Sequence, residues 1–236
     1  MPNNYFTFKQ FTIIQDRCSF KVGTDGVLLG ASADITGTLH ILDIGTGSGL
    51  IALMLAQRSE AEITAIEPDH NSYIQACENV RKSKWFNRIK VLNTSLQDYN
   101  SGNRKFDLII SNPPYFTDSY KNPDTGKAVS RHKITLNNDE LLTGVTRLLK
   151  DSGRLQVIMP YAEGTVFIAE AREYGLYCNN IVKITPLPAS EIRRLILTFS
   201  GKKLITKENL LTIEKGNRHD FTEEYKNLTK DFYLRF

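Results

Sequence analysis

The fold of this chain is decided by a stretch near its middle, which reads Phe106-Asp-Leu-Ile-Ile-Ser-Asn-Pro-Pro-Tyr115. Residues 106–111 form a short apolar run, which predicts a buried strand. The two prolines that follow hold φ at about −65° and remove two N–H donors, so the strand must end there. Because open α/β sheets bind ligands outside the carboxyl ends of their strands, we expect a binding site at Asn112–Tyr115.

The residue types at this strand end suit a planar group that carries an NH2. The Asn112 side chain and the Pro113 carbonyl are acceptors for its two hydrogens, and Tyr115 offers an aromatic face for stacking. The same tetrapeptide could be no more than a rigid turn. Its interpretation therefore depends on the other motifs of the chain.

A second motif lies upstream, where a strand expected over 39–44 runs into Gly45-Thr-Gly-Ser-Gly49 and then a helix expected over 50–56. Glycines let the backbone approach a ligand closely, and the amino end of a helix offers free N–H groups. Such a loop by itself would also fit a dinucleotide. The next strand, expected over 63–66, ends in Glu67, which is positioned to accept both ribose hydroxyls of a nucleoside.

Together, the glycine loop, Glu67 and Asn112–Tyr115 resemble the S-adenosylmethionine-dependent amino-methyltransferases, over roughly residues 40–160. The resemblance implies that the loop passes the methionine moiety of the cofactor and that the acid holds its ribose. It also implies that Asn112, Pro113 and Tyr115 are catalytic and present the target amine. The candidate cofactor-binding residues are Thr24, Asp43, Gly45, Thr46, Gly47, Gly49, Glu67, Pro68, Ser95, Leu96 and Asn112.

The grip on the cofactor adenine has two interpretations. The resembled enzymes hold the adenine after the third strand, expected here over 89–92, and many of them place an acid where this chain has Ser95. Either Ser95 accepts from the adenine amine with backbone help from Leu96, or Asp98 reaches back three residues.

The amino-terminal stretch 5–22 alternates apolar and polar residues, with a phase slip at Lys9-Gln10. This pattern predicts two short strands, or one strand with a bulge. We expect most of its four phenylalanines to pack on the main domain. The basic residues Lys9, Arg17 and Lys21 are expected to face nucleic acid.

Residues 8–30 carry a more specific resemblance, to one group within these methyltransferases. They read Phe8-Lys-Gln-Phe-x-Ile-x-Gln-Asp-Arg-Cys-x-x-Lys-Val-Gly-Thr-Asp-Gly-Val-Leu-Leu-Gly30, which is similar to the amino-terminal signature of bacterial valine-tRNA adenine-N6 methyltransferases. Residues 221–236 also look like that family. The implied substrate is the adenosine 3′ of the anticodon, so the implied partner is a tRNA anticodon stem-loop. The resemblance places Lys21, Thr24 and Asp25 at the mouth of the site.

Residues 116–133 have no periodic hydrophobic pattern and carry a net charge of +2. A structureless stretch of this length in a compact domain is usually functional or disordered. Its place beside the expected pocket favours a lid that grips the substrate, with Lys121 and Arg131 as contacts. A merely solvated loop is the alternative interpretation.

Helix signals are present at three further places. Thr24 or Asp25 can cap a helix over 27–33. A helix over 138–150 is expected to end at Gly153. A helix over 69–83 carries an apolar stripe through Tyr73, Ile74, Cys77 and Val80.

The carboxyl-terminal half completes an α/β pattern. A strand over 154–159 precedes a helix near 163–174, and strands follow over 181–184 and 194–199. The link Leu187-Pro-Ala-Ser190 is too short for a helical crossover, so the last two strands must be antiparallel. We therefore predict an α/β, Rossmann-like methyltransferase fold, with a seven-stranded, mostly parallel sheet, one antiparallel strand and a short amino-terminal strand ribbon.

Beyond that sheet, residues 202–215 are expected to add an edge strand and 221–232 a short helix. We expect a single domain over 1–236, with the ribbon and a helix over 1–38, the catalytic core over 39–200 and a carboxyl-terminal part over 201–236.

Composition sets broad limits. The chain has 236 residues, 41% of them hydrophobic and 24% charged, which is typical of a globular protein. It shows neither an apolar run of 18 residues nor a signal peptide, so we expect a cytoplasmic protein with no membrane partner. We also expect a monomer. A net charge of +4 permits an anionic partner without demanding one. Three cysteines and four histidines show no metal-ligand spacing, so no metal site is expected.

Two other enzyme classes share the tetrapeptide chemistry. Glutamine-N5 methyltransferases acting on release factors also carry Asn-Pro-Pro-Tyr, because a side-chain amide presents the same planar NH2. Those enzymes have a helical amino-terminal domain, whereas the segment before Gly45 is short and strand-like here. N6 or N2 methylation of ribosomal RNA is a further alternative. A non-catalytic binding module is disfavoured by the intact Asn112–Tyr115.

Overall fold

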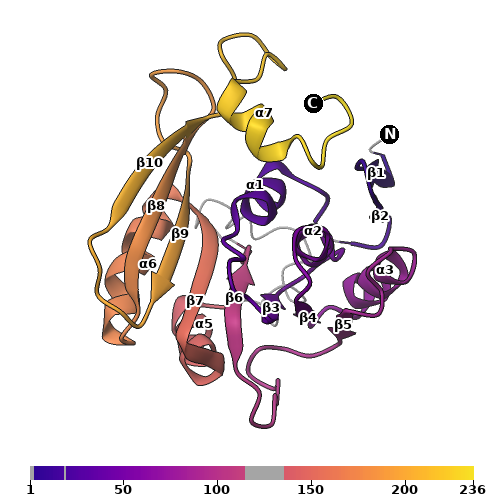
Figure 1. Cartoon of the computed structure of the whole chain (residues 1–236), viewed down its shortest axis with the longest axis vertical. Coiled ribbons are helices and arrows are strands. Elements are labelled where there is room, and N and C mark those ends of the chain that lie inside the picture. Colours follow the sequence, from indigo (N-terminus) through magenta and orange to yellow (C-terminus); the bar gives the residue numbers. More distant parts are fainter. Residues whose placement is uncertain (1–2, 19, 115–135) are drawn as a thin grey trace, which may run out of the picture.

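The computed structural model describes residues 3–18, 20–114 and 136–236. In these residues, eight strands form one sheet in the order β10-β8-β9-β7-β6-β3-β4-β5 (Figure 1). Its strands are β3 (His40–Ile44), β4 (Glu62–Ile66), β5 (Ile89–Leu92), β6 (Phe106–Ser111), β7 (Leu149–Pro160), β8 (Tyr177–Thr185), β9 (Arg194–Ser200) and β10 (Lys207–Thr212).

Strand β9 runs against the other strands of the described sheet. It pairs antiparallel with both β7 and β8, whereas the remaining described neighbours pair in parallel. Residues 186–193 link β8 to β9 without a helix, which confirms the predicted reversal. The sheet has eight strands instead of seven, because the edge strand expected within 202–215 forms as β10 and joins β8 in parallel.

Helices cover both faces of the sheet, because apolar side chains alternate along its central strands. Leu108 and Ile110 of β6 face one core, and Ile109 faces the other. The first core includes residues of α1 (Thr24–Ser32), α2 (Leu50–Arg58), α3 (His70–Arg81) and α7 (Glu223–Thr229). The second includes residues of α5 (Asn138–Leu148) and α6 (Tyr161–Glu173) (Figure 1). None of the described helices is long and apolar enough to cross a membrane.

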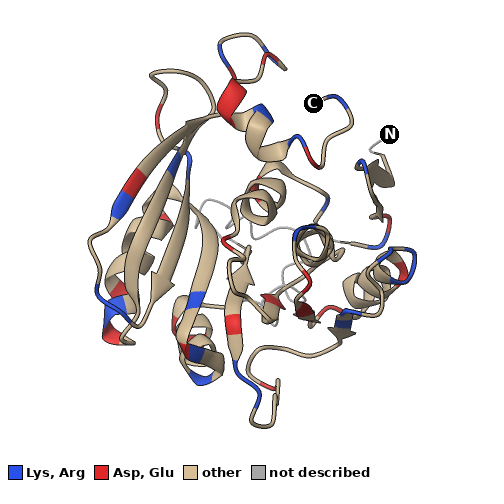
Figure 2. Cartoon of the chain, in the orientation of Figure 1, with Lys and Arg blue, Asp and Glu red and all other residues tan. Residues whose placement is uncertain are grey.

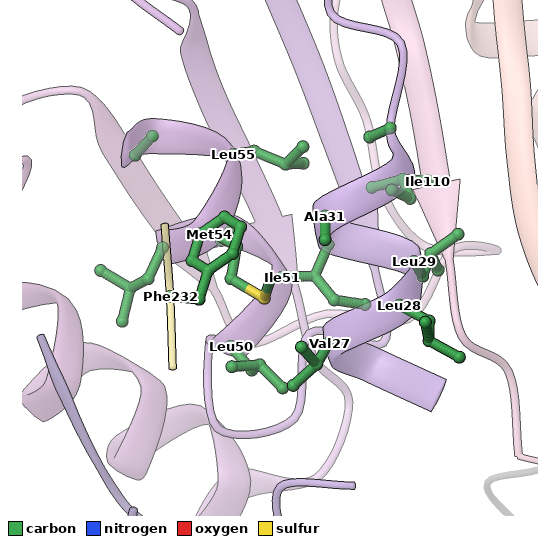
Figure 3. Packing of buried hydrophobic residues seen from close by; sticks show 14 of the residues in the cluster. Val27, Leu28, Leu29, Ala31, Leu50, Ile51, Met54, Leu55, Ile110 and Phe232 are labelled. Atoms are coloured by element: carbon green, nitrogen blue, oxygen red, sulfur yellow. The ribbon is translucent and has the colours of Figure 1, made fainter. Parts of the chain in front are cut away.

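Helices α1 and α2 pack closely through a glycine. A Cβ on Gly30 would lie 2.8 Å from the Sδ of Met54, so any larger residue there would have to displace the Met54 side chain. Figure 3 shows apolar side chains of both helices, among them Ala31 of α1 and Ile51 and Met54 of α2. The packing holds the first turn of α1, which carries Thr24 and Asp25, at the edge of the sheet where Arg194 begins β9.

The amino-terminal stretch forms two short strands, β1 (Tyr5–Thr7) and β2 (Thr12–Ile14), paired antiparallel. The rings of Phe8 and Phe11 are buried and stack with their centroids 4.8 Å apart. The prediction that most of the phenylalanines pack on the main domain is therefore confirmed, although Phe20 is 72% exposed. Figure 1 shows this ribbon on the side of the molecule that also carries the carboxyl end of the chain.

Two predictions about helix ends were wrong. Helix α1 starts at Thr24 with Gly23 as its N-cap, and no side chain caps it, so neither Thr24 nor Asp25 has the predicted capping role. Helix α5 ends at Leu148, and Gly153 lies inside β7. Glycine is needed there because a Cβ would lie 2.8 Å from the carbonyl oxygen of Phe106 on the neighbouring strand.

Candidate active site

The ends of β3 and β6 bring the two principal motifs together. Ile44 pairs with Ser111 in parallel register, and the Ser111 hydroxyl donates to the Ile44 carbonyl at 2.9 Å. Gly45 and Asn112 therefore leave the same edge of the sheet from adjacent strands. Asn112 is half-buried and Pro113 is buried. Tyr115, Lys121 and Arg131 lie outside the described residues, as does the stretch 116–133 predicted to be a lid.

The glycine loop has a backbone that demands glycine. Gly45, Gly47 and Gly49 have φ values of 69°, 57° and 85°, in the left-handed region that other residues rarely adopt. The N–H groups of Gly45 and Thr46 donate to the Ile66 carbonyl at 2.9 and 3.1 Å, which fastens the loop to the end of β4. A Cβ on Gly45 or Gly47 would meet no atom within 4 Å, so open space borders the loop.

Glu67 follows β4 and is 7% exposed. One of its oxygens accepts from the Gly47 N–H at 2.8 Å, and the other accepts from the Asp69 N–H at 2.9 Å. Burial raises the pKa of this carboxyl, and the two N–H donors oppose that rise. Pro68 is exposed, and the Asn93 side chain donates to the carbonyls of Glu67 and Pro68. The acid, the glycine loop and the segment after β5 are thus joined by hydrogen bonds.

Asp43 is fully buried at the base of the glycine loop. Its Oδ2 accepts from the Thr46 hydroxyl at 2.6 Å, while its buried Oδ1 has no hydrogen-bond partner among the described residues. Burial raises the pKa of Asp43 to about 7, although the Thr46 hydroxyl favours the ionised form. Asp43 therefore supports the loop through Thr46, and the Ala52 N–H of α2 also favours its ionised form.

The two interpretations of the adenine grip involve residues that contact one another. The Ser95 hydroxyl donates to the Asp98 carboxylate at 2.6 Å, and the Asp98 N–H donates back to the Ser95 Oγ at 3.1 Å. Leu96, which lies between these two residues in the sequence, is buried. The polar feature after β5 is therefore the Ser95–Asp98 pair.

The loop of residues 95–99 is held from outside by α5, which the sequence did not suggest. Arg147 donates to the carbonyls of Leu96 and Tyr99, each at 2.9 Å. Gly144, one turn earlier, lies so close that a Cβ would be 2.5 Å from the Cδ2 of Leu96. A glycine inside a helix, where no turn requires it, was the available sequence signal.

Helix α3 turns a polar face toward the molecule, so its predicted apolar stripe is wrong except at Val80. The buried residues are Ser72, Gln75, Ala76, Asn79 and Val80. The reason is that this face of α3 packs against backbone N–H and carbonyl groups of the ribbon and the glycine loop, which need polar partners. The Asn79 side chain donates to the carbonyls of Ile14 and Ser48 at 2.8 and 2.9 Å, and accepts from the Ile14 N–H at 2.9 Å. Asn79 thereby joins the ribbon to the glycine loop.

The remaining candidates lie on the other side of Asn112 or on the amino-terminal segment. Asp25 forms an ion pair with Arg194 at 2.8 Å, and both residues line a pocket together with Thr24. None of the glycine-loop residues lines that pocket. Lys21 is exposed, with its Nζ 3.3 Å from the Asn3 carbonyl.

The two other basic residues of the ribbon have partners within the chain. Lys9 donates to the carbonyls of Lys230 and Phe236, and Arg17 pairs with Glu78 at 3.0 Å. Contact of these residues with nucleic acid stays a prediction. Over the described ranges, no group of three or more His, Cys, Asp or Glu residues could hold a metal ion.

Comparison with known proteins gives a consistent result. The family model of the methyltransferase small domain matches residues 24–165. The chain is 47% identical over 240 residues to a tRNA1(Val) (adenine(37)-N6)-methyltransferase of Trichodesmium erythraeum (strain IMS101), with 100% of both chains covered. It is 45% identical over 237 residues to the protein of the same name from Parabacteroides distasonis, again with 100% of both covered.

Solved structures share the fold at low sequence identity. A predicted O-methyltransferase from Agrobacterium tumefaciens matches with a TM-score of 0.64 and 21% identity, covering 88% of this chain and 96% of that one. A putative RNA methyltransferase from Pyrococcus horikoshii matches with a TM-score of 0.54 and 20% identity, covering 76% and 82%. These likenesses concern the architecture of the sheet and its helices.

Proposed function

This chain belongs to the methyltransferase small-domain family and, within it, to the tRNA1(Val) (adenine(37)-N6)-methyltransferases, and we propose that Asn112 and Pro113 perform its amine chemistry. The enzyme methylates N6 of adenosine 37 in a valine tRNA, with S-adenosylmethionine as the methyl donor. The observation that carries the assignment of the site is the pairing of Ile44 with Ser111, because it sets the glycine loop beside Asn112.

The described residues fit S-adenosylmethionine. Open space borders Gly45 and Gly47, and the Glu67 carboxylate keeps lone pairs for ribose hydroxyls beyond those used by Gly47 and Asp69. In this proposal Gly45–Gly49 and Glu67 hold the cofactor, and the Ser95–Asp98 pair takes its adenine. When bound, the cofactor supplies a methyl group that its sulfonium already activates.

Asn112 and Pro113 orient the acceptor amine. An exocyclic adenine amine is a poor nucleophile because its lone pair is delocalised into the ring. Accepting both of its hydrogens, at the Asn112 side chain and the Pro113 carbonyl, favours a pyramidal nitrogen with an exposed lone pair. Such alignment can be worth roughly 7–11 kcal/mol. The methylated nitrogen then loses its extra proton to water or a neighbouring carbonyl, so no dedicated base is required.

Tyr115 completes the proposed site, and its role rests on the sequence. An aromatic face that stacks on the target adenine would contribute roughly 1–3 kcal/mol. An anticodon-loop nucleotide is unpaired, which lowers the cost of bringing its base out of the stack.

The enzyme is proposed to act in the cytoplasm as a monomer. It is also proposed to need no metal, because the methyl group of the cofactor is already activated.

Asn112→Ala tests this assignment. The substitution removes one of the two acceptors but no apolar core, so methylation of a valine anticodon stem-loop should fall about 10²-fold or more. Cofactor affinity should fall far less than methylation, because Gly45–Gly49, Glu67 and the Ser95–Asp98 pair are proposed to hold the cofactor. Asn209→Ala, at an exposed position on the edge strand β10, is the matched control.

Mass spectrometry of nucleosides from the reacted stem-loop measures the product as N6-methyladenosine. Tyr115→Phe should keep much of the activity, whereas Tyr115→Ala should not. Methylation of a glutamine-containing release-factor peptide, with the stem-loop left unmodified, would overturn the RNA assignment. Full activity of Asn112→Ala would instead refute the role of the tetrapeptide.

A further inference from the structure

A pocket of about 310 Å³ lies at the amino end of α1, beside the ends of β8 and β10 and the start of β9. It is built from segments far apart in the sequence. Its apolar lining comes from Leu28, Ile184, Pro186 and Ile213. Its polar lining includes Asp25, Arg193 and Arg194. Of all the residues that line the pocket, just Thr24 and Asp25 were predicted from the sequence as site residues.

The pocket lies on the same edge of the sheet as Asn112. Ser111 pairs with Val157 of β7, and three residues further along that strand Pro160 pairs with Arg194 of β9. Arg194 is therefore two strand spacings, about 10 Å, to the side of β6, and three residues, again about 10 Å, beyond the level of Ser111. A nucleotide that flanks one bound at Asn112 can extend toward Arg194.

Along the sheet, the cofactor residues that the structure describes occupy one side of Asn112 and leave the other side for flanking nucleotides. The glycine loop and Glu67 follow β3 and β4, which lie on one side of β6 in the sheet. The pocket lies on the other side, where β8 and β10 end and β9 begins. A polynucleotide that presents one base at Asn112 can therefore lead its flanking nucleotides over β7 and β9, toward Arg194.

The lining of the pocket suits a nucleobase better than a phosphate. Asp25 places a carboxylate in the wall, only 2.8 Å from the Arg194 guanidinium, and this acid would repel an anion. A base has an apolar body for Pro186 and Ile213, which are partly exposed in the lining, and edge groups that can pair with Asp25 and Arg194. Figure 2 shows acidic and basic residues interspersed along the chain. We therefore base recognition at this pocket on its own lining and not on a general attraction of the protein for a polyanion.

Arg193 places an exposed guanidinium at the pocket. Its side chain is 66% exposed, and the acid paired with it, Glu191, is 3.8 Å away and 84% exposed. A planar guanidinium exposed in this way can stack on an unpaired base, which is a common way for proteins to recognise single-stranded RNA.

We propose that this pocket binds an unpaired base of the anticodon loop that flanks the methylated adenosine, an inference that rests on the tRNA function proposed above. Asp25 and Arg194 read the edge of that base, and Arg193 covers its face. The pocket thereby sets which loop sequences place their adenosine at Asn112.

Two variants of the full chain test the proposal with a synthetic valine anticodon stem-loop as the probe. Ile213→Trp fills the pocket, and Arg193→Ala removes the exposed guanidinium without touching a buried residue. Each should raise the dissociation constant of the stem-loop, by about tenfold for Ile213→Trp and about threefold or more for Arg193→Ala. Affinity for S-adenosylmethionine should not change. Ile205→Trp, at a position 92% exposed, and Arg172→Ala, on the last turn of α6, are the matched controls.

The second measurement uses stem-loops in which one flanking loop nucleotide at a time lacks its base. At one position, removal of the base should weaken wild-type binding about tenfold and cost the Ile213→Trp variant nothing further, because the two changes remove the same contact. Wild-type affinity in both variants, or an equal cost of base removal in wild type and variant at every position, would overturn the pocket proposal alone. If the wild-type chain neither binds nor methylates the stem-loop, the proposed function fails with it.

Discussion

The Glu67 carboxylate accepts a hydrogen bond of 2.8 Å from the backbone N–H of Gly47, across the gap between the ends of β3 and β4. The acid proposed to hold the ribose therefore also sets the shape of the glycine loop. A change at Glu67 should affect cofactor binding twice, through the lost ribose contact and through the released loop.

Glu67→Ala should weaken binding of S-adenosylmethionine by about one to two orders of magnitude, since each hydrogen bond to a charged group is worth roughly 1.5–3 kcal/mol. Glu67→Gln keeps one acceptor and should lose less. Isothermal titration calorimetry measures both, with Glu60→Ala as the control because the Glu60 side chain is 96% exposed. Unchanged affinity in Glu67→Ala would remove this residue from the cofactor site.

Arg147→Met should raise the KM for S-adenosylmethionine about tenfold and leave kcat at saturating cofactor near the wild-type value. The reason is that Arg147 holds the carbonyls of Leu96 and Tyr99, and a loosened 95–99 loop should bind the adenine less well in ground and transition states alike. Arg147→Lys should restore part of the affinity. Steady-state kinetics separate the two constants, and a fall in kcat without a change in KM would contradict this positioning role.

Asp43→Asn should change the pH dependence of stability. The unfolded aspartate has a pKa of about 3.9, whereas burial raises the pKa of Asp43 to about 7 in the folded chain. The folded state therefore holds the proton more tightly, and Asp43 lowers the free energy of unfolding progressively as the pH rises from about 4 to about 7.

The asparagine variant lacks this titration. The difference between its Tm and that of the wild type should therefore be more in favour of the variant at pH 8 than at pH 5. About 1 kcal/mol shifts the Tm of a domain of this size by roughly 2–4 °C. Thermal denaturation of the cofactor-free protein at the two pH values is the measurement. An equal Tm difference at both values would show that Asp43 does not titrate in this range.

Asn79→Ala should destabilise the attachment of the ribbon. It leaves the N–H and carbonyl of Ile14 and the carbonyl of Ser48 without their partner, and each unsatisfied buried group costs about 1–3 kcal/mol. Amide hydrogen exchange should become faster in β2 and in the glycine loop, while β8 and β9 stay protected. Uniform loss of protection would point to general destabilisation instead.

Local patterns in the sequence determined most of the sheet. Apolar runs predicted the strands around Asn112 and Gly45 because residues along a strand are neighbours in the chain. The short link of residues 186–193 determined the reversal of β9, since a parallel return needs a long crossover. The meeting of the glycine loop with Asn112 also followed, because the carboxyl ends of parallel strands share one edge.

Only the tertiary structure decided which distant segments support the site. The contacts of Ile14 with Asn79, Leu96 with Arg147 and Asp25 with Arg194 span 65, 51 and 169 residues. Each of these partners satisfies a polar group that becomes partly buried only when the helices pack. Periodicity records whether a face is apolar, and so it missed the buried polar face of α3, where Asn79 meets backbone. The pocket beside Arg194 was likewise invisible in the sequence, because four separate segments line it.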